Sequence, residues 1–196
     1  MSSRDKILSA VAANQPNLSA LPDIGILKSD DINIVEKFIE TLTAIGGKVI
    51  KINGFDEVEK HIKLTTVETD RVVSLVPELP NSLAPMVDIE ALPRTLDNIE
   101  LAVLRANIGV AENGAVWLNE SQLGQRVTPF ICQHLAVILN KSDIVPTMYQ
   151  AYDKIGDERY GFATFIAGPS KTADIEQSLV LGAHGSRTMT VFLRDI

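Results

Sequence analysis

The stretch Leu135-Ala136-Val137-Ile138-Leu139 decides the fold class, because all of its side chains are apolar. A strand that is covered on one face alternates apolar and polar residues, whereas a strand that is covered on both faces is apolar throughout. Strands of the second kind occur in parallel sheets with helices on both faces. This run therefore predicts an α/β protein with a buried strand at residues 135–139.

The segments on either side alternate between strand and helix patterns. Apolar runs predict further strands at residues 48–52, 71–76, 99–104, 115–118, 162–167 and 189–193. Helical spacing of apolar residues predicts helices at residues 32–45 and 173–181, near Val58 and Ile62, and after Pro146. This order is typical of a single α/β domain with a largely parallel open sheet flanked by helices.

The N-terminal segment differs from the rest. Ile7, Leu8 and Val11 predict a short helix, and a polar, Pro-containing connection at residues 15–29 separates it from the next predicted helix. We therefore expect two parts: an N-terminal helical arm at residues 1–29 and an α/β domain at residues 30–196.

Charge and hydropathy argue against several classes of partner. The 196 residues include 18 Lys and Arg against 25 Asp and Glu, which gives a net charge of −7. Because a negative chain repels phosphate backbones and anionic lipids, we expect neither nucleic acid nor a membrane surface as a partner. No stretch approaches the ~20 apolar residues of a membrane span, and the first residues lack the apolar core of a signal peptide. We therefore expect a cytoplasmic protein.

Cys132 is the only cysteine in the sequence. One thiol cannot form an internal disulfide, a zinc site of several thiolates or the ligand set of an iron–sulfur cluster. The three histidines include no H-x-H or H-x-x-x-H pair, so no metal site is expected. We expect no intrinsic cofactor, and any redox metal would lie on a partner chain.

The segment GPSKTAD at residues 168–174 follows a predicted strand and opens a predicted helix. Its glycine permits an unusual backbone angle, and a hydroxyl side chain can cap the helix. The free N–H groups of the first turn and the lysine would then form an anion site beyond the carboxyl end of the strand. The expected residues of this site are Gly168, Ser170, Lys171, Thr172 and Asp174. An ordinary capped helix explains the same pattern.

Two tight turns carry candidate catalytic side chains. His184 stands on a turn with Gly185, where it can donate a proton or bind a carboxylate. Glu112 precedes the turn residues Asn113 and Gly114, and a carboxylate there can act as a base or nucleophile or bind a hydroxyl. A turn histidine that bonds its own backbone and a plain hairpin with a solvated glutamate are the alternatives.

Arg126 and His134 flank the loop at residues 127–133. Arg126 can bind a carboxylate through two parallel hydrogen bonds. His134 begins an apolar strand, where it can contribute to the same anion site, although a histidine at the edge of a core is the more common case.

Together these segments resemble the LUD domain of the lactate-utilisation protein C family. The run at residues 168–185 resembles the family's C-terminal signature, and residues 109–117 resemble its central Ala-Glu-Thr-Gly motif. Arg126, Pro129 and His134 resemble the segment that comes after that motif. The departures from the family pattern are Asn113 in place of Thr, Phe130 in place of a second Pro, and Ser186 in place of the Pro after His-Gly.

The resemblance implies a fold and a role. The fold would be like that of ribose-5-phosphate isomerase, glucosamine-6-phosphate deaminase and the coenzyme A transferases. The role would lie in the oxidation of L-lactate to pyruvate by a three-component cytosolic system, in which other subunits carry the iron–sulfur clusters.

Three functions are open on the sequence alone. The first is an accessory or small-carboxylate-binding subunit of that lactate system, with iron–sulfur subunits as partners. The second is a stand-alone enzyme on an isomerase or coenzyme A transferase scaffold, which binds a phosphate or acyl group and uses Glu112 as base or nucleophile. The third is a ligand sensor or interaction module without chemistry. A homo-oligomer is open in each case.

Overall fold

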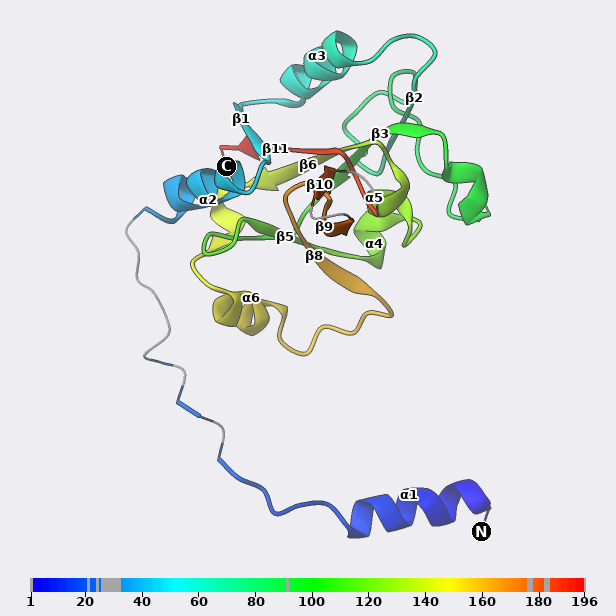
Figure 1. Cartoon of the computed structure of the whole chain (residues 1–196), viewed down its shortest axis with the longest axis vertical. Coiled ribbons are helices and arrows are strands. Elements are labelled where there is room, and N and C mark those ends of the chain that lie inside the picture. Colours follow the sequence, from blue (N-terminus) through cyan, green and yellow to red (C-terminus); the bar gives the residue numbers. More distant parts are fainter. Residues whose placement is uncertain are drawn as a thin grey trace.

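Figure 1 shows the computed structural model of the chain, which describes residues 2–20, 22, 23, 25, 33–90, 92–175, 178–181 and 184–195, with the backbone only for residues 172–175 and 178–181. The helices are α1 (Ser3–Ala13), α2 (Ile34–Ala44), α3 (Phe55–Thr65), α4 (Glu120–Leu123), α5 (Thr128–Ile131) and α6 (Met148–Ile155), with 3₁₀ turns η2 (Pro93–Leu96) and η3 (Lys141–Asp143). The strands are β1 (Lys48–Ile52), β2 (Arg71–Ser74), β3 (Ile99–Arg105), β4 (Ile108–Val110), β5 (Ala115–Asn119), β6 (His134–Asn140), β7 (Ile144–Val145), β8 (Ala163–Ala167), β9 (Lys171–Ile175), β10 (Ser178–Leu181) and β11 (Thr188–Arg194).

A five-stranded sheet forms the centre of the molecule and confirms the predicted α/β class. Its order is β1-β11-β6-β3-β2, and every neighbouring pair is parallel. β6 is the middle strand, and all residues from 135 to 139 are buried, as the apolar run predicted. On one face, Val58 and Ile62 of α3 share a core with Ile138 and Phe192 of the sheet.

The opposite face of the parallel sheet packs against α2 and a second sheet. Phe38 and Leu42 of α2 are fully buried in one core with Leu139 of the first sheet and Val116 of the second. The amphipathic spacing predicted this face of α2, because Phe38 and Leu42 lie one helical turn apart. Figure 1 shows α2 and α3 on opposite sides of the sheet.

The second sheet, in the order β7-β4-β5-β8, was not predicted. β4 and β5 form an antiparallel hairpin at the turn that Asn113-Gly114 predicted, and Gly114 has a φ of 68°. β8 was expected in the parallel sheet but pairs antiparallel with β5, from Ala115 opposite Ala167 to Asn119 opposite Ala163. An apolar run predicts a strand but does not specify its partner, which is why the prediction missed this sheet.

The helix predicted at residues 173–181 is wrong. The backbone there forms two short strands, β9 and β10, which pair antiparallel with Ser178 opposite Ile175 and Leu181 opposite Lys171. Apolar residues this few can fit a helical or an extended pattern, so periodicity alone did not separate the two. The predicted anion site used the free N–H groups of that helix, so its physical basis is lost.

The first helix, α1, contains no buried residue, and its apolar side chains Ile7, Leu8 and Val11 are exposed. Within the described ranges, no helix has the length and apolar character that are needed to cross a membrane.

Candidate functional site

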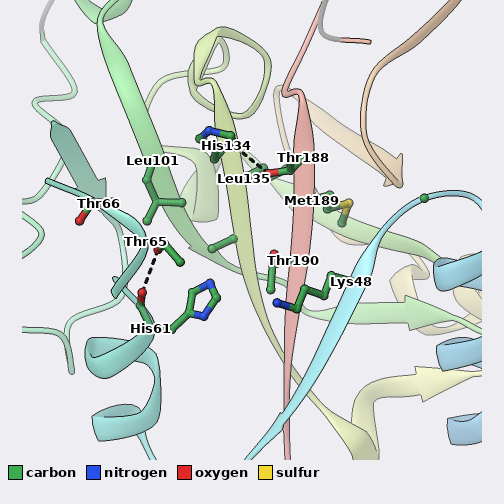
Figure 2. A pocket seen from close by; sticks show the side chains of 12 residues that line it. Lys48, His61, Thr65, Thr66, Leu101, His134, Leu135, Thr188, Met189 and Thr190 are labelled. Atoms are coloured by element: carbon green, nitrogen blue, oxygen red, sulfur yellow. Dashed lines mark hydrogen bonds between the residues drawn. The ribbon is translucent and has the colours of Figure 1, made fainter. Parts of the chain in front are cut away.

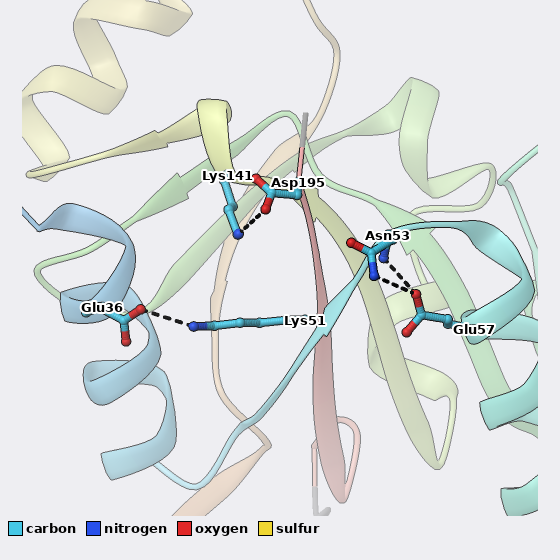
Figure 3. A network of polar contacts seen from close by, with 6 residues as sticks. All are labelled: Glu36, Lys51, Asn53, Glu57, Lys141 and Asp195. Atoms are coloured by element: carbon cyan, nitrogen blue, oxygen red, sulfur yellow. Dashed lines mark hydrogen bonds and ion pairs between the residues drawn. The ribbon is translucent and has the colours of Figure 1, made fainter.

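At the carboxyl ends of β1, β6 and β11, polar groups contact one another within the chain. The contacts, all drawn in Figure 3, are Lys51–Glu36 at 3.1 Å, Lys141–Asp195 at 2.7 Å and the Asn53 backbone N–H to the Glu57 carboxylate at 2.8 Å. Ligands of open α/β sheets usually bind at carboxyl ends, and that rule guided the sequence prediction. Here these charged groups already have partners.

A pocket of about 350 Å³ lies at the opposite end, where the parallel strands begin. We call it the amino-end pocket. Strands β1, β3, β6 and β11 form its floor, and the C-terminal turn of α3 borders it (Figure 2). Its lining residues are Gly46, Lys48, His61, Thr65, Thr66, Leu101, His134, Leu135, Ala136, Thr188, Met189 and Thr190.

Strand register places the polar side chains of this pocket in two adjacent rows. Lys48 of β1 lies opposite Thr190 of β11, and two residues earlier Thr188 lies opposite His134 of β6. Residues two apart on a strand point to the same face, which here is the face that α3 covers through Ile62. Because α3 ends at Thr65, it leaves the two polar rows uncovered.

Three side chains of the pocket and its border contact one another across three strands. The Nδ1 atom of His134 lies 2.7 Å from the Thr188 hydroxyl, and its Nε2 atom lies 3.3 Å from Oε1 of Glu100. The pairing of β2 and β3 shifts register at Arg71 and Val72, which lie opposite Ile99 and Leu101. Glu100 is therefore the extra residue of a bulge, and bulges re-aim a side chain.

Lys48 adds a positively charged ammonium to the pocket, and His61 adds an imidazole ring beside it. Burial, and after it the nearby Lys48 ammonium, lowers the pKa of His61 below its usual value. The His61 ring packs edge-on against Phe192, with ring centroids 5.1 Å apart. No carboxylate in the described part of the chain pairs with Lys48. A bound anion would therefore meet an unneutralised ammonium and an imidazole that a negative charge would help to protonate.

The residues predicted from the loop at 168–174 and the turn at 184–185 border a different pocket of about 440 Å³, here called the loop pocket. Gly168, Ser170, Lys171, His184 and Gly185 all line it, together with Phe130 and Ser186. These five predicted residues therefore do lie together in space.

Two donors of that group, however, already have acceptors within the chain. The Ser170 backbone N–H donates to the Ser186 carbonyl at 2.8 Å, and the Lys171 ammonium donates to the carbonyl of Ile45. Gly168 does adopt the left-handed conformation, with a φ of 72°. The side chains of Thr172 and Asp174 lie outside the described residues.

The other predicted residues lie elsewhere. Glu112, Asn113 and Gly114 form the β4–β5 turn and line neither pocket; the Glu112 N–H donates to Pro146, and its side chain is exposed. Arg126 pairs with Glu120 at 3.3 Å, so a carboxylate of the chain itself occupies its guanidinium. His134 lines the amino-end pocket. The predicted grouping of Glu112, Arg126, Lys171 and His184 around one ligand is therefore not formed.

Among the polar residues of the amino-end pocket and its border that were not predicted from the sequence are Lys48, His61, Glu100, Thr188 and Thr190. A signal for the two threonines was present, because they alternate with apolar residues in a strand that is otherwise buried. Lys48 and His61 carry no local signal, since only strand register and the length of α3 bring them to the same pocket. Across the described ranges, no group of three or more His, Cys, Asp or Glu side chains could hold a metal ion.

Comparisons with known proteins agree with this fold. The model of the LUD domain matches residues 74–193. Lactate utilization protein C of Bacillus pumilus is 36% identical over 50% of this chain and 46% of its own length. Lactate utilization protein C of Bacillus velezensis is 32% identical over 83% of this chain and 73% of its own length.

A solved structure, that of a duf162 family protein from Deinococcus radiodurans, superposes with a TM-score of 0.61 at 15% identity. The superposition covers 83% of this chain and 96% of that protein, and this likeness supports the fold alone. The expected likeness to sugar-phosphate isomerases and coenzyme A transferases stays a prediction. Because the domain model matches residues 74–193 and the Bacillus velezensis relative matches most of both chains, the chain belongs to the lactate utilization protein C family of LUD domain proteins.

Proposed function

We propose that this chain is an accessory, small-carboxylate-binding subunit of a cytoplasmic system that oxidises lactate to pyruvate, with the iron–sulfur centres on partner subunits. The names of its relatives support the lactate context. The observation that carries the binding role is the amino-end pocket, where Lys48 lies beside the Thr190 hydroxyl and the His61 ring (Figure 2) and has no carboxylate partner among the described residues.

The chemistry of this lining fits a small carboxylate. An ammonium and a hydroxyl both donate to carboxylate oxygens, and charge-assisted hydrogen bonds of this kind are about twice as strong as neutral ones. A volume of about 350 Å³ lies at the small end of known ligand pockets. Leu101 and Ala136 supply an apolar wall for a short carbon chain.

The single thiol supports placing the metal centres on partner subunits. Cys132 is buried, and burial raises the pKa of its thiol to about 12. A thiolate is the form that binds iron, so this side chain is a poor ligand even for a shared cluster.

Calorimetric titration with L-lactate and with pyruvate tests the proposal. We expect saturable one-site binding, with Lys48→Met lowering the affinity about tenfold because the ammonium that faces the carboxylate is gone. Lys63→Met is the matched control: Lys63 is an exposed α3 lysine that lies outside the pocket and pairs weakly with Glu59 at 3.8 Å, and the affinity of this variant should stay at the wild-type value. If neither acid binds, or if Lys48→Met and Lys63→Met behave alike, the binding role is wrong.

A further inference from the structure

We infer that the Glu100–His134–Thr188 chain recognises the oxygen on the second carbon of the bound acid, so that the amino-end pocket selects 2-hydroxy and 2-oxo acids over plain carboxylates. This inference rests on the proposed carboxylate site and adds a specificity determinant to it. His134 was expected from the sequence as a general anion contact, whereas Glu100 and Thr188 were not expected at all.

The spacing of the two threonines is the first support. Thr188 and Thr190 point to the same face of β11, and a rise of about 3.3 Å per residue puts their positions about 6.6 Å apart. A ligand that accepts from Thr190 with its carboxylate and bonds Thr188 with its next oxygen uses two hydrogen bonds of about 2.8 Å. Because neither hydrogen bond has to lie along the strand axis, two oxygens on adjacent carbon atoms, the arrangement of a 2-hydroxy or 2-oxo acid, can bridge the two threonine hydroxyls.

The tautomer of His134 determines how the Thr188 hydroxyl is used. With its proton on Nε2, the His134 ring turns an N–H towards the Glu100 carboxylate 3.3 Å away and accepts the Thr188 hydroxyl proton at Nδ1. The Thr188 oxygen then has free lone pairs, which accept from the hydroxyl of a 2-hydroxy acid. The 2.7 Å contact between Nδ1 and the hydroxyl has the length of a hydrogen bond in either direction of donation.

If His134 is protonated, the hydrogen bond between His134 and Thr188 runs in the opposite direction. Both ring nitrogens then carry a proton and Nδ1 donates to Thr188, so that the Thr188 hydroxyl proton turns towards the ligand and donates to the carbonyl of a 2-oxo acid. One side chain can thus serve either oxidation state of the second carbon.

A purely structural role would be to join β3, β6 and β11 near their N-terminal ends. The two roles differ in one measurable respect. A structural contact affects the binding of all acids equally, whereas a contact to the second-carbon oxygen affects only acids that possess this oxygen.

Dissociation constants for L-lactate, pyruvate and propionate, which lacks that oxygen, test the inference. We expect the wild-type chain to prefer lactate and pyruvate over propionate about tenfold. Thr188→Val should remove this preference and leave the propionate affinity unchanged, whereas Thr188→Ser should retain the preference because the hydroxyl is kept. Glu100→Gln should reduce the preference while the His134 ring stays in place. Thr164→Val on β8, a strand threonine outside both pockets, is the control and should behave as wild type.

The outcomes separate the two proposals. Binding of all three acids with equal affinity, or an equal loss for all three in Thr188→Val, overturns the specificity inference and leaves the carboxylate site standing. Absence of binding by any acid to the folded wild-type chain overturns both. Retention of the preference in Thr188→Val, with an unchanged melting temperature, also overturns the inference.

Discussion

Lys171 donates its ammonium protons to the carbonyl of Ile45, the residue that ends α2. This bond joins the start of β9 to α2, and a cation at a helix C-terminus is favourable for the helix dipole. A lysine that the sequence assigned to ligand binding therefore stabilises the fold in this structure.

Lys171→Met should lower the free energy of unfolding by about 1 kcal/mol, which is typical of one such bond at a helix end. Affinity for lactate should not change, because Lys171 does not line the amino-end pocket. Urea unfolding and calorimetry on the same preparation measure both quantities, with Lys6→Met on the exposed α1 as control. If Lys171→Met lost lactate binding while its stability stayed unchanged, the ligand would bind in the loop pocket and not in the amino-end pocket.

Gly114 has no room for a side chain. A Cβ atom at this position would lie 2.9 Å from the backbone N and Cα of Leu42, and its φ of 68° is strained for other residues. Gly114→Ala should therefore cost about 2–3 kcal/mol of stability, the sum of backbone strain and overpacking. Gly156→Ala isolates the strain, because its φ is 54° but the nearest atom is 3.7 Å away; about 1 kcal/mol is expected there. Equal costs would mean that α2 yields to the added methyl group.

His61 should make the protein less stable in mild acid. Its pKa is lowered in the folded chain, mainly by burial, so the unfolded chain binds a proton more readily. The penalty is absent well above the unfolded pKa of about 6.5 and grows as the pH falls below that value. Urea unfolding at about pH 8 and about pH 5.5 should show a smaller loss for His61→Gln than for wild type. An equal loss in both would mean that other groups carry the acid sensitivity.

Ligand binding should reverse this effect. A carboxylate beside His61 favours its protonated form, so the affinity for lactate should rise as the pH falls from about 8 to about 6. His61→Gln should flatten that dependence. A steeper dependence in the variant would place the titrating group elsewhere.

Features that depend on a short stretch of sequence were predictable. The apolar run at residues 135–139 indicated the buried strand, the spacing of Phe38 and Leu42 indicated the buried face of α2, and Asn113-Gly114 indicated a hairpin turn. Each depends on the side-chain period of a single element or on the φ that a turn requires.

Features that depend on long-range pairing were not predictable. The partner of β8 and the hairpin of β9 and β10 follow from tertiary pairing, which a short apolar run does not specify. The amino-end pocket is lined by residues that lie far apart in the sequence, such as Lys48 and Thr188. Their proximity follows from β1 pairing with β11, so no local motif could indicate it.

Amide chemical-shift mapping during titration with L-lactate tests most directly whether the amino-end pocket binds the ligand. We expect saturable shifts at Lys48, Thr188 and Thr190, with little change around Ser170 and His184. Shifts confined to Ser170 and His184 would show instead that the ligand binds in the loop pocket, and the proposed carboxylate site would be wrong.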